Sequence, residues 1–185
     1  NGSGASWSTN CIESGDSSST PIYDTGRIER SGDNGGTLRI DGSIPDAEVS
    51  IYREADISFM TSPVLTFNYE ENTLETGENA YLDIYDGTTW NNAVETFDST
   101  SGTGTYGISL VPYISSSTRI RFRANDWSSS TGDLFYIDDV QIDEANMVIN
   151  IDLPGGSNPD DTIVIPPSSA KEWPSTATDL YNEAF

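Results

Sequence analysis

Short segments in which apolar and polar residues alternate recur from residue 37 to residue 153, and clusters of glycine, asparagine and serine separate them. A period of two predicts β-strands, and no stretch in this region shows the 3.6-residue period of an amphipathic helix. Strands are expected at 37–40, 49–52, 64–69, 81–85, 93–97, 106–110, 119–124 and 135–142. A set of about eight short strands is typical of a jelly-roll. The sequence therefore predicts an all-β fold, a jelly-roll β-sandwich with a C-terminal β extension.

The pattern changes after Glu144. Residues 147–153 alternate strictly, Pro154-Gly155-Gly156 forms a turn, and a second short strand is expected at 162–165, which together predict a separate β-hairpin. Prolines then bracket a polar stretch that is typical of a semi-extended linker. We divide the chain into a jelly-roll at 1–143, a hairpin-like extension at 144–166, and a linker with a C-terminal docking segment at 167–185.

Charge and composition exclude several classes of function. The chain has 8 basic and 30 acidic residues and a net charge of −22, which argues against nucleic acid or an anionic membrane surface as a partner. It has no histidine, so Ser-His-Asp and Cys-His catalysis are excluded and we expect no enzymatic activity. No apolar run is long enough to insert into a membrane. The abundance of serine, threonine, glycine and acidic residues favours an extracellular or cell-surface location.

The strand 136–142, Tyr-Ile-Asp-Asp-Val-Gln-Ile, together with Ser62-Pro63 and the strand 65–69, resembles the MAM-like and carbohydrate-binding jelly-roll modules of bacterial surface proteins. The resemblance covers residues 1–143. It implies a structural calcium ion beside this strand, held by oxygen ligands as calcium requires. The implied ligands are Asp138, Asp139, Glu13 and Asp16, with Glu183 from a neighbouring copy. The alternative is that these carboxylates cap turns or stay solvated.

The resemblance also implies a first strand, carrying an acidic residue and an aromatic residue, before the glycine-rich stretch that contains Trp7. That strand is not found ahead of Trp7, whereas residues 181–185 offer its pattern. The interpretation that follows is a filament subunit, in which the C-terminal segment of one copy inserts into the jelly-roll of the next. The docking residues would be Leu180, Tyr181, Glu183 and Phe185. A repeat excised from a tandem array, or a short helix at 180–185, are the open alternatives.

A second hypothesis is a calcium-dependent carbohydrate-binding or adhesion module of a larger surface protein. Trp90 and Trp127 lie in or beside expected turns and are candidate glycan contacts, the alternative being that they belong to the core. Asn1 begins an Asn-Gly-Ser sequon and is a candidate glycosylation site. Arg119, Arg121 and Arg123 alternate along one strand and so share a face. They pair either with cross-strand carboxylates of the same chain or with an acidic surface or anionic glycan.

Overall fold

The computed structural model describes residues 5–16, 26–30, 37–42, 48–125, 127, 132–145, 147–151 and 161–165. The chain divides into two compact units, residues 1–144 and residues 145–185. The strands of the first unit are β1 Ile12–Ser14, β2 Ile28–Arg30, β3 Leu38–Asp41, β4 Glu48–Ala55, β5 Pro63–Asn72, β6 Ala80–Tyr85, β7 Trp90–Phe97, β8 Thr103–Ser109, β9 Thr118–Asn125 and β10 Leu134–Glu144. A turn of 3-10 helix at Val111–Tyr113 follows β8.

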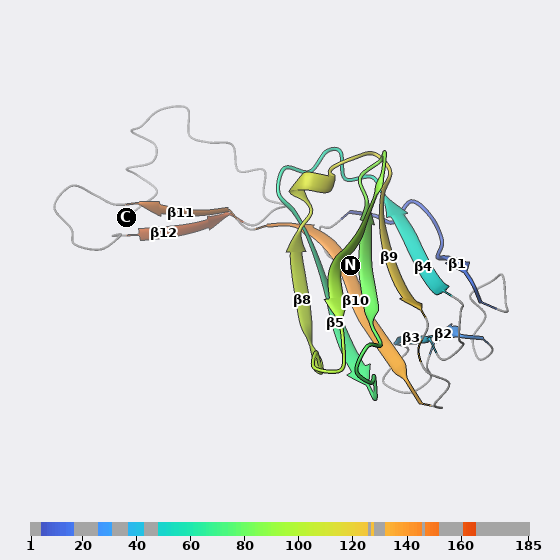
Figure 1. Ribbon diagram of the computed structural model, residues 1–185. Coiled ribbons are helices and arrows are strands. Elements are labelled where there is room, and N and C mark those ends of the chain that lie inside the picture. The colour runs from blue at the N-terminus through green and yellow to red at the C-terminus, as the bar shows by residue number, and fades with distance from the viewer. Residues whose placement is uncertain are drawn as a thin grey trace, which may run out of the picture. The chain divides into compact units, whose positions relative to one another are not determined.

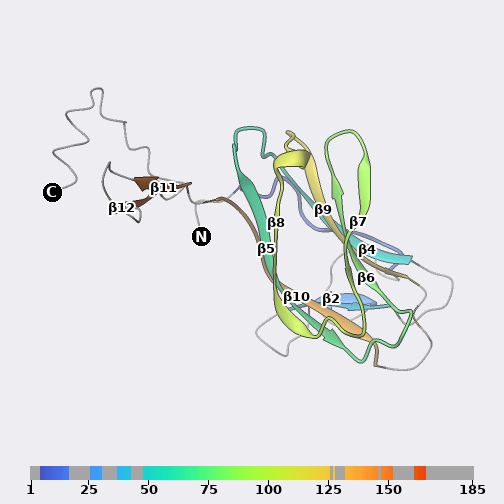
Figure 2. The same cartoon turned by 60° about the vertical axis from the view of Figure 1, so that its left-hand side comes forward.

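These strands form two five-stranded sheets that face each other (Figures 1 and 2). Sheet A has the order β1-β4-β9-β6-β7, and sheet B has the order β2-β3-β10-β5-β8. Every pairing between neighbours is antiparallel. The predicted all-β jelly-roll sandwich is therefore confirmed.

The core lies between the sheets and is rich in aromatic rings. Phe67 of sheet B packs edge-on against Phe122 of sheet A, with ring centres 4.9 Å apart, and Phe97 lies 5.0 Å from Phe135 across the same space. All four side chains are at most 5% exposed. The first pair is edge-to-face and the second is tilted, and aromatic contacts of both kinds between the sheets add to the stabilisation that comes from burying their area.

Two strands that the pattern did not predict are the three-residue strands β1 and β2, each at one edge of its sheet. Neither is long enough to show a repeat, so their pairing depends on the neighbouring strand. The remaining expected strands all appear, and β7 begins at Trp90, three residues earlier than predicted. The turn before it is as expected, because Asp86 N–H donates to Thr89 O and Gly87 adopts a φ of 93°.

The second unit contains an antiparallel pair of strands, β11 Met147–Ile151 and β12 Asp161–Ile165. This pair is the predicted C-terminal β extension. Along the described ranges, the structure has no helix with the length and apolar character needed to cross a membrane.

Candidate functional site on the outer face of sheet A

The outer face of sheet A carries the three alternating arginines of β9. Their neighbours in the strand, Ile120 and Phe122, are 2% and 5% exposed and point into the core, as the alternation predicted. Each guanidinium has a carboxylate partner from an adjacent strand of the same chain, which confirms the first of the two predicted alternatives. Arg119 pairs with Glu54 of β4 at 2.8 Å.

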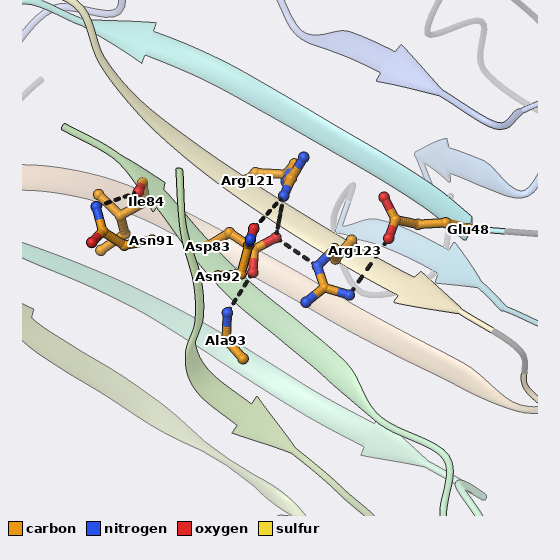
Figure 3. A network of polar contacts seen from close by, with 8 residues as sticks. All are labelled: Glu48, Asp83, Ile84, Asn91, Asn92, Ala93, Arg121 and Arg123. Atoms are coloured by element: carbon orange, nitrogen blue, oxygen red, sulfur yellow. Dashed lines mark hydrogen bonds and ion pairs between the residues drawn. The ribbon is translucent and has the colours of Figure 1, made fainter. Parts of the chain in front are cut away.

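Asp83 of β6 is the centre of this network (Figure 3). Its side chain is fully buried, and Oδ2 accepts from Arg121 Nε at 2.9 Å and from Arg123 Nε at 2.7 Å. Oδ1 accepts from the Ala93 amide at 2.7 Å. Arg123 also approaches Glu48 of β4, at 3.5 Å. A carboxylate with two guanidinium partners and one amide partner has its charge and both oxygens satisfied, so it fixes the arginines on the sheet.

Aromatic rings surround the fixed guanidinium groups. Arg121 lies 4.1 Å from the ring centre of Trp90, and Arg123 lies 4.1 Å from that of Tyr81. Arg119 lies over Tyr52 and Tyr85, at 5.4 and 4.8 Å. These distances are within the range of cation–π attraction. The rings are partly exposed, so the face presents flat apolar surface beside hydrogen-bond donors.

A bulge in β7 brings further polar groups to this face. The register between β6 and β7 shifts between Leu82 and Ile84, and Ala93 adopts a φ of 50° at that point. The irregularity aims the Ala93 amide at Asp83 and lets the Asn92 side-chain oxygen accept from Arg121 at 2.9 Å. Bulges often re-aim side chains in this way. Trp90 meets Tyr85 at 5.4 Å and Tyr52 at 6.0 Å between ring centres, so aromatic groups from β4, β6 and β7 meet above the arginines.

The predicted ligands Asp138 and Asp139 lie at a second bulge, in β10. Simple alternation would place the two side chains on opposite faces, but the register shifts after Asp138 and Asp139 has a φ of 52°. Asp138 Oδ1 accepts from the Asp139 amide, and Asp139 Oδ2 accepts from Asn68 Nδ2 at 3.0 Å. Both carboxylates are thus engaged in local hydrogen bonds.

Glu13 lies in β1, which belongs to sheet A, and Asp16 follows that strand, whereas β10 belongs to sheet B. Both carboxylate oxygens of Glu13 are buried, and neither has a hydrogen-bond partner among the residues that the structure describes. Burial, and secondarily the nearby charge of Asp16, raises the pKa of Glu13. Asp16 Oδ1 accepts from the Arg27 amide at 2.8 Å. In the part of the chain that the structure describes, no three acidic or cysteine side chains come close enough together to hold a metal ion. The calcium site stays a prediction that requires ligands from elsewhere.

Trp127 is not a surface residue. Its side chain is fully buried, and its Nε1–H donates to Asn79 O at 2.9 Å. We therefore withdraw it as a glycan contact, because a buried indole cannot meet a ligand. Trp90 does reach the surface. The predicted docking residues Leu180, Tyr181, Glu183 and Phe185, and the sequon at Asn1, all lie outside the described residues.

The described residues pair only part of one edge of sheet B. On the edge of β10 away from β5, β3 pairs with Leu134 to Ile137. Beyond that point, the described residues add a single backbone hydrogen bond, from Ala5 N–H to Ile142 O at 2.8 Å. A cavity of about 260 Å³ lies beside this edge, lined from both sheets.

Comparisons with known proteins agree on the architecture. No protein-family profile matches this chain, and no curated protein matches its sequence. Among solved structures, a family 61 carbohydrate-binding module in complex with β-1,4-galactotriose shares 12% identity and a TM-score of 0.50, over 74% of this chain and 90% of that chain. The fold is that of a jelly-roll β-sandwich.

Two further structures are similar at lower scores. The N-terminal cellulose-binding domain of Cellulomonas fimi β-1,4-glucanase C shares 14% identity over 73% of this chain and 88% of that chain, with a TM-score of 0.46. The family 11 carbohydrate-binding module of Clostridium thermocellum, in complex with a β-1,3-1,4-mixed-linked tetrasaccharide, shares 12% identity over 77% of this chain and 88% of that chain, with a TM-score of 0.42.

Sequence reasoning missed most of the aromatic face. Tyr52, Tyr81 and Tyr85 were seen only as strand residues, and Asp83 as part of an alternating pattern. These residues come together because of the register between β4, β9 and β6. Arg121 of β9 lies opposite Tyr52 of β4 on one side and opposite Asp83 of β6 on the other. A search for aromatic residues at every second position of the strands next to the arginine strand would have found them.

Proposed function

We propose that this protein is a glycan-binding module and that the outer face of sheet A is its binding surface. The observation that carries the proposal is the group of rings from Trp90, Tyr85 and Tyr52 around Arg121, which Asp83 holds in place. A site for a polyhydroxylated ligand needs aromatic rings and a few hydrogen-bonding groups held beside them, and this face has both. The similarity of the fold to carbohydrate-binding modules supports the same proposal. We place the protein outside the cell, in a binding rather than a catalytic role.

The charges of the face favour a neutral glycan. Arg119, Arg121 and Arg123 are balanced by Glu54, Asp83 and Glu48, and the whole chain carries a net charge of −22. An acidic polysaccharide would meet no unpaired arginine among the described residues of this face and would be repelled at longer range. A neutral sugar could stack its C–H face on an exposed ring and accept hydrogen bonds from the guanidinium edges.

A panel of soluble and insoluble glycans tests this proposal, with Trp90→Ala as the diagnostic variant. Loss of one central aromatic contact should weaken binding roughly tenfold or more. Phe59→Ala is the matched control, since Phe59 is an aromatic residue that is 72% exposed outside this face. If both variants bind glycan equally well, sheet A is not the binding site. If the wild-type protein binds no glycan of the panel, the proposed function is rejected.

A second candidate function is the head-to-tail filament, in which one copy adds a β-strand to the next. The partly open edge of β10 is the observation that favours it, because such an edge offers unpaired backbone groups to an added strand. Calcium is proposed for either candidate, and in a filament it would lie beside the carboxylates of the acceptor, where an acidic side chain of the neighbour enters. Negative-stain electron microscopy of the full chain tests assembly, and the same images with a chelator test calcium. Filaments that survive chelation would remove calcium alone.

A further inference from the structure

The open stretch of β10 has a lined cavity behind it. Sheet B contributes Leu38, Ile137 and Val140 to the walls, and sheet A contributes Ile51, Ile120 and Phe122. These side chains make the inner walls apolar. The volume of about 260 Å³ is of the order needed for one large side chain together with solvent. The space therefore has room for a residue that the described part of the chain does not provide.

Charged side chains also line the cavity, namely Arg53 of β4 and the carboxylates Asp138 and Asp139 of β10. Arg53 lies 5.0 Å from the ring centre of Trp7 and donates to Thr9 O at 3.2 Å. Within the described ranges, no carboxylate lies within ion-pair distance of Arg53. A half-buried guanidinium without a counter-ion favours an acidic ligand group. The cavity therefore suits an apolar group together with one acidic group that lies toward Arg53 and away from Asp138 and Asp139.

We propose that this cavity and the open edge of β10 together form the acceptor groove for residues 180–185 of a second copy of the chain. Tyr181, Glu183 and Phe185 alternate, so an extended segment presents an aromatic, an acid and an aromatic on one face. That face matches the groove: an aromatic side chain enters the apolar cavity, and Glu183 reaches Arg53. Backbone groups of the segment pair with the β10 stretch between Asp138 and Ile142. The inference rests on the second proposed function and gives it a site.

The rate at which Cys11 reacts with a thiol reagent reports whether this groove is covered. Cys11 is the single cysteine of the chain, it lines the cavity and it is only partly buried. Burial raises the pKa of its thiol, so labelling rates are compared at one fixed pH. A docked strand would cover the mouth of the cavity and slow the reaction of Cys11 with a maleimide.

The experiment measures the Cys11 labelling rate of the full chain as a function of protein concentration. We expect the rate to fall roughly tenfold as concentration rises, because a covered site reacts only when it opens. A synthetic peptide of residues 178–185, in excess, should protect Cys11 in dilute protein. Phe185→Ser and Glu183→Gln should abolish protection, whereas Ala184→Ser, on the opposite face of the segment, should keep it. Arg53→Glu combined with Glu183→Arg should restore protection that either change alone removes.

Each outcome supports or overturns the inference. Protection that does not change with dilution means that the segment binds its own copy, which overturns docking between copies. A labelling rate that neither concentration nor peptide alters overturns the groove. Filaments seen by electron microscopy with Cys11 still reactive would keep the filament function and reject this site for it. Absence of both filaments and protection would reject both.

Discussion

Substitution of Asp83 by alanine tests the network that organises sheet A. The change removes a fully buried carboxylate and leaves Arg121 and Arg123 in place, with side chains 18% and 13% exposed. It also leaves the Ala93 amide without its acceptor. Breaking a buried ion pair by removing one partner costs 3–5 kcal/mol in general, and the residual exposure of the arginines places this case at about 3 kcal/mol. For a chain of this size that corresponds to a fall in Tm of roughly 6–12 °C.

Urea denaturation followed by tryptophan fluorescence measures this loss directly. Glu54→Ala is the matched control, because its partner Arg119 is 33% exposed and such a pair contributes only about 0–1 kcal/mol. Asp83→Asn keeps the shape of the side chain while removing the charge, so it should fall between the two. If Asp83→Ala unfolds within about 1 kcal/mol of the Glu54→Ala variant, the buried carboxylate is not what fixes the face, and the reasoning is refuted.

Two further predictions concern other parts of the jelly-roll. Glu13→Gln should raise Tm at pH 7 in the presence of a chelator and have little effect below pH 4. Burial raises the pKa of Glu13 in the folded state, so the buried ionised carboxylate destabilises the fold fully only above that raised pKa, and the cost disappears once the group is protonated in both states. A lower Tm at pH 7 would contradict it. Gly42→Ala should destabilise by about 1–3 kcal/mol through overpacking, since a Cβ there would lie 2.2 Å from Trp127 Cδ2. Gly107→Ala, whose nearest contact would be 3.6 Å, is its control in urea denaturation, and equal stabilities would contradict the clash.

The central strands were predictable because their side chains alternate over several residues. In β5, Leu65 and Phe67 are buried, and Tyr69 packs against the core on the same side, as the pattern indicated. In β9 the same alternation separated the arginines from the core. Each of these features is a property of one strand alone, which is why the sequence suffices for it.

The site was less predictable because it is a property of register between strands. The bulges at Ala93 and Asp139 have positive φ values at residues other than glycine, and no local signal in the sequence marks them. Trp127 looked like a turn residue by its polar neighbours, but Gly42 leaves the space that its indole fills. These contacts join residues far apart in the chain, so alternation cannot reveal them.

Glycan binding by sheet A is the central claim, and titration calorimetry with the best glycan from the panel tests it most directly. Wild type and Phe59→Ala should bind with equal affinity, and Trp90→Ala should bind roughly tenfold or more weakly while remaining folded under the conditions of the titration. Undiminished affinity in a folded Trp90→Ala variant would contradict the account.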